Sequence, residues 1–267
     1  MKKLVSLILA VTAGLFLASC QGQNNIFTYT IDESYTEYIT LGTSADYPPY
    51  EWPMKVSGKQ TLVGIDIEIA KEVAKALGKN LKVVNKGFEF LLDDLENGKV
   101  DFVLAGMNPS EERKKQVDFS IIYYEANQVI LVNESEKDSF ASLESLNVAS
   151  LRIGAQIGSV QQTLVEEHFN KAQTQFIQSV PDLVLRLSNK QLNAVVVERP
   201  VAEGYLKNIS GLHILDLQIG NPEEGSAAAV QKGNTELLAV INQVLESLIS
   251  SGKMDQIIFD MTELNKN

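Results

Sequence analysis

A repeated alternation of strand-like and helix-like segments constrains the fold of this chain more than any other feature. In the first half, such segments follow one another at residues 38–42, 65–77, 81–84, 89–96 and 101–105. The predicted helix 65–77 ends at Gly78, and its apolar side chains recur every four residues, at Ile65, Ile69, Val73 and Leu77. Strands separated by helices favour a parallel sheet with helices on its faces.

The same alternation restarts in the second half of the chain. Segments of the two kinds follow one another at residues 151–156, 160–169, 174–178, 181–187, 192–197 and 200–206. An extended run at 121–133 joins the halves, and a short strand at 227–230 precedes two helices, at 235–250 and up to residue 259. We therefore predict two α/β lobes, which 267 residues suffice to build. Ligands of such sheets lie beyond the carboxyl ends of the strands.

One stretch at such an edge, AGMNPSEER (105–113), has the composition of an anion site. Gly106 lacks a Cβ and lets a ligand come close. Pro109 suits the first turn of a helix, whose free amides attract anions. Arg113, five residues after Asn108, can present a planar fork of donors to the same anion. An exposed arginine at a strand-to-helix corner is the alternative.

The loop 43–52 is stiff and aromatic. Pro48 and Pro49 bar it from a helix or a central strand. Tyr47, Tyr50 and Trp52 place three of the 19 aromatic residues within six positions. Aromatic side chains on a rigid loop wall a pocket or cap a core, and the sequence leaves both open.

Charge and cysteine content exclude several classes of site. A net charge of −11, without a basic stripe, argues against nucleic acid as a partner. The single cysteine permits no internal disulfide. One thiol and two distant histidines, His168 and His213, cannot form a Cys/His metal cluster, so we expect no metal and no cofactor, although carboxylate sites stay open.

The N-terminus is typical of an exported lipoprotein. Two lysines precede an apolar run at residues 4–18, which is too short for a comfortable membrane span. The run ends in Leu-Ala-Ser-Cys20, which resembles the bacterial lipobox, where the cysteine receives acyl chains such as palmitate. We predict a signal peptide at 1–19, a tether at 20–26 and a lipid anchor on the extracytoplasmic face of the cell membrane. An ordinary secretory signal is the alternative.

Six motifs occur in a characteristic order: GTSADYPPYEW (42–52), GIDIEIAKEVAKALG (64–78), GKVDFVLAGMNPSEERKKQVDFS (98–120), YYEANQVILV (123–132), GAQIGSVQQTL (154–164) and LNAVVVERPVAEGYL (192–206). Together they resemble the extracytoplasmic solute-binding proteins of bacterial ABC importers, family 3, polar amino acid type. The resemblance runs from about residue 39 to 259. It implies capture of a free amino acid, with delivery to the permease and ATPase subunits of an importer.

The resemblance also implies an architecture. Family members have the two-lobed type II periplasmic-binding-protein-like fold, with two hinge-crossing strands, and close on the ligand like a Venus flytrap. Carried over, lobe 1 comprises residues 27–126 and 230–267, and lobe 2 comprises 127–229. A monomer is expected.

The resemblance assigns ligand-binding roles to eight positions: Tyr47, Phe88, Gly106, Asn108, Arg113, Ser159, Val160 and Glu198. The first two match aromatics that sandwich the ligand side chain. Arg113 matches the carboxylate-binding arginine, and Glu198 an aspartate that pairs with the α-ammonium.

The remaining four positions match backbone and hydroxyl contacts to the head group. Three positions depart from the family pattern. Asn108 replaces a threonine or serine, Val160 lacks a hydroxyl, and Glu198 is one methylene longer.

Elementary electrostatics supports the roles of Arg113 and Glu198. A zwitterion that leaves water needs an opposite charge beside each of its own charges, or its desolvation costs several kcal/mol. Arg113 answers one charge and Glu198 the other, from opposite halves of the sequence, so the ligand would join the lobes. A surface ion pair for Glu198 is the alternative.

The identity of the ligand is less constrained. Family members that bind basic ligands often carry an acid where this chain has Ser44, but acids lie close by. Candidate selectivity positions are therefore Ser44, Asp46, Glu51 and Trp52. We expect a polar amino acid and favour a basic one, because the acidic surface steers cations towards the protein.

Two other functions are compatible with the same sequence. Cyclohexadienyl dehydratases share the fold, and Glu198 could then serve as an acid. We nevertheless expect no enzyme and assign no catalytic residue. A ligand-sensing surface lipoprotein without a transport role would keep the pocket and lose the permease partner.

Overall fold

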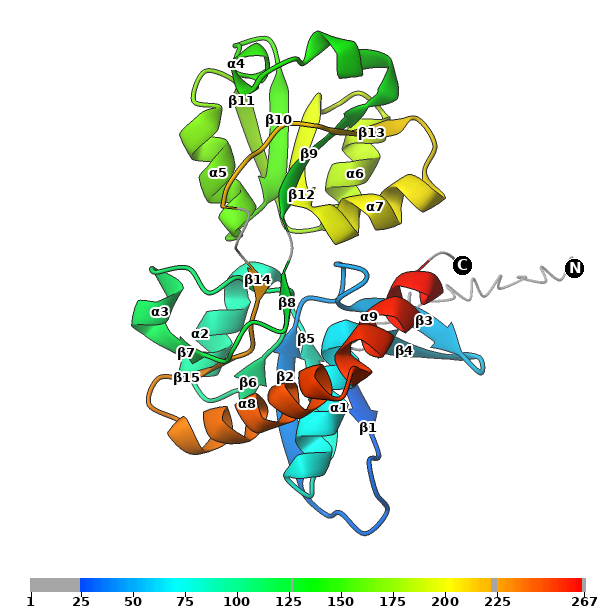
Figure 1. Cartoon of the computed structure of the whole chain (residues 1–267), viewed down its shortest axis with the longest axis vertical. Coiled ribbons are helices and arrows are strands. Elements are labelled where there is room, and N and C mark those ends of the chain that lie inside the picture. The colour runs from blue at the N-terminus through cyan, green and yellow to red at the C-terminus, as the bar shows by residue number, and fades with distance from the viewer. Residues whose placement is uncertain (1–24, 126, 222–224, 266–267) are drawn as a thin grey trace, which may run out of the picture.

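The computed structural model describes residues 25–125, 127–221 and 225–265. The predicted signal peptide, Cys20 and most of the tether lie outside the described residues. Figure 1 shows two bodies, one above the other, joined by a narrow waist. The described part contains no helix with the length and apolar character needed to cross a membrane.

The lower body, lobe 1, is built on a six-stranded mixed sheet. Its strand order is β1 (Ile26–Tyr29), β5 (Asn80–Asn85), β2 (Tyr38–Thr43), β6 (Phe102–Val103), β15 (Ala229–Gln231) and β7 (Val117–Phe119). Strands β5, β2 and β6 are parallel, as the alternation predicts, whereas β1 and β15 are antiparallel to their neighbours. The helices of this lobe are α1 (Ile65–Ala76), η1 (Phe88–Phe90), α2 (Leu91–Glu96), α3 (Arg113–Gln116), α8 (Thr235–Ser250) and α9 (Lys253–Leu264).

The upper body, lobe 2, is built on a five-stranded sheet. Its order is β11 (Gln173–Ile177), β10 (Arg152–Gln156), β12 (Ala194–Glu198), β9 (Gln128–Asn133) and β13 (Leu212–Leu215). Its helices are η2 (Glu134–Ser139), α4 (Leu143–Leu146), α5 (Val160–His168), α6 (Val180–Ser188) and α7 (Arg199–Asn208). The predicted strand–helix order of this half is confirmed element by element.

Two short strands lie between the bodies. β8 (Tyr124–Glu125) pairs antiparallel with β14 (Gly225–Ser226), and both are drawn at the waist in Figure 1. This pair corresponds to the two crossing strands that the resemblance predicts. The exact lobe limits, 27–126 with 230–267 and 127–229, stay a prediction.

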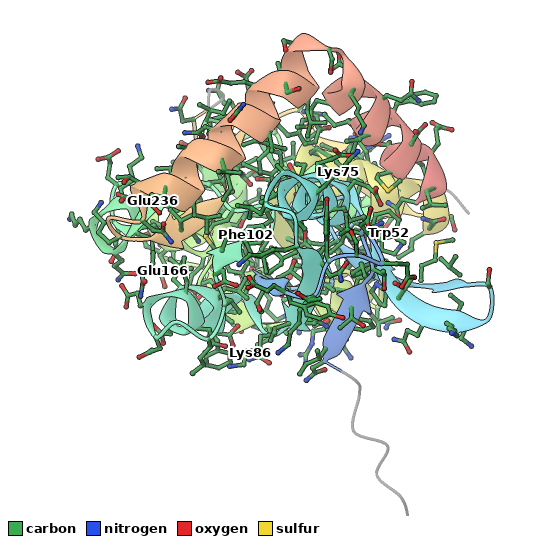
Figure 2. All side chains as sticks on the ribbon, turned by 90° about the horizontal axis from the view of Figure 1, so that it is seen from below. Trp52, Lys75, Lys86, Phe102, Glu166 and Glu236 are labelled. Atoms are coloured by element: carbon green, nitrogen blue, oxygen red, sulfur yellow. The ribbon has the colours of Figure 1, made fainter. Side chains whose placement is uncertain are left out.

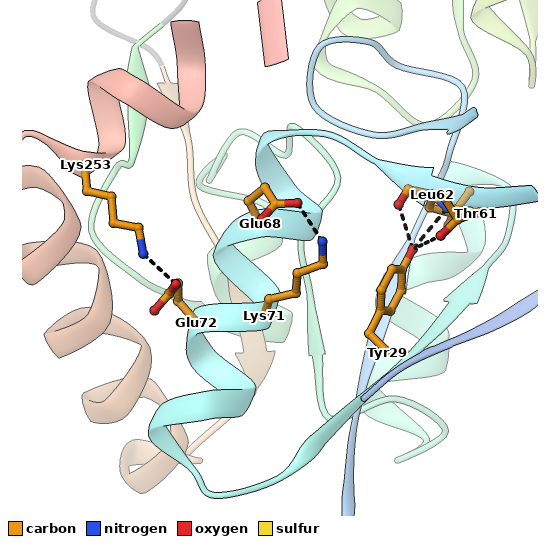
Figure 3. Close-up of polar contacts among 7 residues, drawn as sticks. All are labelled: Tyr29, Thr61, Leu62, Glu68, Lys71, Glu72 and Lys253. Carbon is orange, nitrogen blue, oxygen red and sulfur yellow. Dashed lines mark hydrogen bonds and ion pairs between the residues drawn. The ribbon is translucent and has the colours of Figure 1, made fainter. Parts of the chain in front are cut away.

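Helix α1 shows how the periodic sequence builds the core of lobe 1. Ile65, Ile69 and Val73 are fully buried against the sheet, and each such side chain stabilises the fold by about 1.5–3 kcal/mol. Figure 2 shows Phe102 of β6 in the interior, with Lys86, Glu166 and Glu236 towards the margins. On the solvent side, α1 is tied to α9 by the Glu72–Lys253 ion pair, 2.6 Å long (Figure 3).

A hairpin of β3 (Trp52–Val56) and β4 (Lys59–Val63) was not predicted. Its turn, Ser57–Gly58, has two positive φ angles, 49° and 79°, which match the twist of a tight hairpin. The hairpin is held to the edge strand β1 by Tyr29, whose hydroxyl donates to the Leu62 carbonyl at 2.7 Å and accepts from the Leu62 amide at 3.0 Å (Figure 3). A serine–glycine pair flanked by extended residues is the signal that could have indicated it.

The helix predicted to start near Pro109 is wrong in its bounds. Residues 108–110 are not helical, and α3 begins only at Arg113 and lasts four residues. The reason is local, because the Asn108 carbonyl is taken by the Ser110 amide at 3.0 Å and by the Arg113 side chain at 2.7 Å. The chain therefore makes a tight corner before the helix starts.

Candidate functional site

The corner at Gly106 leaves little room for a side chain. Its φ is +53°, and an added Cβ would lie 3.0 Å from the Tyr47 ring and 3.2 Å from the Tyr50 ring. The Gly106 amide donates to Asp66 Oδ2 at 2.8 Å, which fixes the peptide's orientation. The glycine therefore lets the loop pass directly against the aromatic residues of the 43–52 loop.

Arg113 reaches from lobe 1 to lobe 2. Its Nη1 donates to the Asn108 carbonyl at 2.7 Å, and its Nη2 donates to the Gly158 carbonyl of lobe 2 at 2.9 Å. The guanidinium carbon lies 5.2 Å from the centre of the Phe88 ring, an attractive cation–π distance. The side chain is buried, so its charge lies at the boundary between the lobes.

Glu198 lies at the carboxyl end of β12 and is fully buried. Asn108 Nδ2 donates to its Oε1 at 3.2 Å, and the Tyr47 hydroxyl accepts from its amide at 3.3 Å. Burial is the main cause that raises the pKa of Glu198 to about 7. Asn108 thus connects the two predicted charges, because its carbonyl receives Arg113 while its amide group contacts Glu198.

Ser159 and Val160 start helix α5, directly after Gly158. The Ser159 hydroxyl accepts from the Gln162 amide at 3.2 Å and donates to the Gln156 carbonyl at 2.7 Å. Serine is a favoured cap at this position, so its hydroxyl is already used by the helix. A cavity of about 580 Å³ opens beside this helix start.

The cavity lies between the lobes. Its lining includes the predicted residues Phe88, Arg113, Ser159 and Val160, together with the acids Glu89, Asp93, Glu112 and Glu167. The other four predicted residues, Tyr47, Gly106, Asn108 and Glu198, do not line it. Tyr47 instead stacks on Tyr50, with ring centres 5.6 Å apart. The sandwich of a ligand between Tyr47 and Phe88 therefore stays a prediction for the bound state.

The four candidate selectivity residues lie in different environments. The Ser44 hydroxyl donates to Asp46 Oδ1 at 3.3 Å, and burial raises the pKa of Asp46 to about 6. Glu51 is fully buried, and burial with the neighbouring charge of Asp66 raises its pKa well above the usual range. Trp52 is half-buried on the hairpin, paired with Val63, and does not line the interlobe cavity.

Sequence reasoning missed Asp66, which connects the loop at Gly106 to Tyr123, the residue before β8. Besides receiving the Gly106 amide, its Oδ1 accepts from the Tyr123 hydroxyl at 2.7 Å. Burial raises the pKa of Asp66 to about 6. The available signal was an acid at the second position of α1, between two isoleucines of the apolar face.

Two glutamines were missed as well. Gln161 Nε2 donates to Gln128 Oε1 at 2.7 Å, and Gln128 lies in a strand whose six residues are all buried. For Gln128, a polar residue directly before the apolar run 129–132 was the signal. Among the described residues, no group of three or more His, Cys, Asp or Glu side chains is arranged to hold a metal ion.

Comparison with known proteins gives a consistent result. The model of the family described as bacterial extracellular solute-binding proteins, family 3, matches residues 39–259. The arginine-binding extracellular protein ArtP of Bacillus subtilis is 33% identical over 260 residues, which cover 96% of each chain. A probable histidine-binding protein of Campylobacter jejuni is 27% identical over 258 residues, covering 97% of this chain and 98% of the relative.

Solved structures agree with the sequence relatives. The substrate-binding protein AbpA of Streptococcus pneumoniae, bound to L-arginine, has a TM-score of 0.82 at 30% identity and covers 86% of this chain and 96% of its own. An ancestral arginine-binding protein bound to arginine has a TM-score of 0.77 at 35% identity and covers 85% and 98%.

Proposed function

The chain belongs to family 3 of the bacterial extracellular solute-binding proteins, and from that premise we propose how it captures its ligand. A free amino acid enters between the lobes outside the cell membrane. The lobes close on it by bending at β8 and β14, and the closed complex delivers it to an ABC permease and its ATPase.

One observation carries this proposal. Arg113 from lobe 1 and Glu198 from lobe 2 are both buried at the boundary between the lobes, and Asn108 contacts both. A carboxylate and an ammonium on one carbon provide an opposite charge to each member of such a pair, whereas either group alone would provide only one of the two. We therefore assign the ligand carboxylate to Arg113 and the ligand ammonium to Glu198.

We propose a basic amino acid, with arginine as the first candidate. Three buried acids lie near the boundary: Glu51, Asp66 and Glu198. Their pKa values are raised because negative charge is buried there without enough cations. Relatives named for arginine and histidine binding support the same ligand class.

The test is a thermal-shift screen of the twenty amino acids, followed by calorimetry with the best stabiliser, since a ligand of the native state raises the melting point. We expect Arg113→Ala to weaken binding by about 100-fold or more and to leave the fold intact, because the ligand carboxylate loses its fork of donors. Arg199→Ala, at an exposed arginine on α7, is the matched control. An unchanged affinity of Arg113→Ala would contradict the assignment.

The absence of enzymatic activity and the lipid anchor on Cys20 belong to the same proposal. Structural neighbours include an ancestral amino acid-binding protein described as a precursor of cyclohexadienyl dehydratase, so the enzyme alternative has a direct check. Amino acids incubated with the protein should be recovered unchanged. Neighbouring genes for a permease and an ATPase would favour transport over a purely sensory role.

A further inference from the structure

Asp46 of lobe 1 contacts the start of a helix in lobe 2. It follows β2, and its Oδ2 accepts the backbone amide of Val180, the first residue of α6, at 3.1 Å. Its Oδ1 lies 3.5 Å from Gln156 Nε2, at the end of β10. Asp46 is thus bonded to two elements of the opposite lobe.

The start of α6 has free amides that an acceptor can satisfy. The Ser179 hydroxyl takes the Asp182 amide at 3.2 Å, as a cap from within lobe 2. The Val180 amide is taken by Asp46 from the other lobe. A carboxylate at the start of a helix is favoured both by the helix dipole and by a charge-assisted hydrogen bond.

Lobe 1 holds the carboxylate ready for this contact. The Ser44 hydroxyl donates to Asp46 Oδ1 at 3.3 Å, and the Asp46 amide donates to the Ser44 carbonyl at 2.7 Å. Next to it, the side chains of Glu89 in lobe 1 and Gln178 in lobe 2 are hydrogen-bonded. The end of β11 and the start of α6 are therefore the part of lobe 2 that docks on lobe 1 here.

We propose that Asp46 is a closure latch: its bond to the first amide of α6 stabilises the closed arrangement of the lobes, with or without a ligand and whatever the ligand side chain is. This inference rests on the proposed function but replaces the selectivity role that the sequence suggested for Asp46. The Asp46 carboxylate is already hydrogen-bonded to Val180, Gln156 and Ser44. It therefore acts by holding lobe 2 in position and not by contact with the ligand, which makes Asp46 a positioning residue.

Asp46→Ala tests the latch through its effect on different ligands. We expect the dissociation constants for arginine, histidine and glutamine to rise by the same factor, about tenfold, with faster release measured by stopped flow. A selectivity residue would instead lose affinity for the cationic ligands alone, and that result would overturn the latch. Asp46→Asn should lose less, because an amide oxygen can still accept from Val180.

Asp182→Asn is the matched control, because Asp182 lies in the first turn of the same helix and is exposed, with its backbone capped within lobe 2. We expect less than about a twofold effect on any ligand. Equal losses in Asp182→Asn and Asp46→Asn would show a general charge effect at α6 and would overturn the latch.

Hydrogen exchange of the Val180 amide keeps this test separate from the proposed function. The closed arrangement protects that amide through Asp46, so the ligand-free Asp46→Ala protein should exchange it about tenfold faster than the wild type. An unchanged exchange rate would overturn the latch even if amino acids bind. If no amino acid binds the wild type and the Val180 amide exchanges faster in the variant, the ligand assignment is contradicted and the latch is still supported.

Discussion

At the scale of single residues, burial has more influence than hydrogen bonding on the pKa values of the carboxyl groups in the site. The Glu198 carboxylate accepts hydrogen bonds from Asn108 and Gln128, yet its pKa is raised to about 7 because the loss of water outweighs those hydrogen bonds. A carboxylate that is buried in this way is stabilised in its charged form when an ammonium group binds beside it. The same logic applies to Asp46 and Asp66, whose pKa values are raised to about 6 by burial.

These shifts predict an unusual dependence of stability on pH. Because the pKa of Glu198 is raised above its usual 4.5 to about 7, the native state binds a proton more readily than the unfolded state. Keeping Glu198 ionised in the native state therefore costs stability in full above pH 7, and this cost disappears as the pH falls towards 4.5. The free energy of unfolding should rise by up to ~3 kcal/mol from pH 8 to pH 5. Denaturant titration of the ligand-free protein over this range measures it.

Glu198→Gln should remove the contribution of Glu198 to that rise and leave the contributions of Asp46 and Asp66, whereas Glu203→Gln, at an exposed position on α7, should leave the whole rise unchanged. Wild-type stability that falls or stays level between pH 8 and pH 5 would contradict the burial argument.

The residues of the site were predictable to different degrees. Arg113 and Glu198 follow from motif order and from the need to answer two ligand charges. Asp66 and Gln128 could not be found this way, because each lies inside an apolar pattern and its partner is distant in sequence. Their role depends on contacts that only the packed fold creates, such as Asp66 with Tyr123.

At the scale of elements, the turn between β6 and α3 packs directly against the Tyr47 ring. Gly106→Ala places a Cβ 3.0 Å from the Tyr47 ring and keeps a positive φ. We expect a loss of about 1–2 kcal/mol in the free energy of unfolding and about tenfold in ligand affinity, measured by denaturation and calorimetry.

Gly78→Ala is the control for backbone strain alone. Gly78 also has a positive φ, +66°, but an added Cβ meets no atom within 4 Å. It should cost about 1 kcal/mol of stability and no affinity. Equal effects of the two substitutions on binding would show that contact with Tyr47 is irrelevant.

Most elements were predictable because hydrophobic periodicity dominates them, as in α1 and α6. The short α3 was misplaced because a side chain, Arg113, competes for the carbonyl that a longer helix would have used. The hairpin of β3 and β4 was missed since its strands are largely exposed and β4 carries no apolar alternation that would pair it with β3.

At the scale of the whole molecule, apolar and polar contacts both join the lobes. The main hydrophobic core contains Tyr47 and Tyr50 of lobe 1 together with Val180, Val197 and Val201 of lobe 2. At the far end, Asn208 of α7 donates to the Asn265 carbonyl, just past α9, at 2.9 Å. The two-lobed plan was predictable from the repeated alternation, but the contacts across the boundary were not, because they join residues far apart in the chain.

The predicted membrane anchor also belongs to this scale, although Cys20 lies outside the described residues. Cys20→Ala should release the protein into the medium, because acyl chains on that residue are the expected attachment. Cell fractionation with quantitative immunoblotting measures the shift, and Thr12→Ala in the same leader is the control. Retention of the Cys20 variant at the membrane would argue against lipidation.

The central claim is that Arg113 and Glu198 hold the head group of one amino acid between the lobes. Calorimetric titration of the wild type and Glu198→Gln, each with an amino acid and with its des-amino analogue, tests this most directly. The substitution should weaken the amino acid far more than the analogue, because only the amino acid leaves an ammonium buried without its counter-charge. Equal losses for both ligands would contradict the claim.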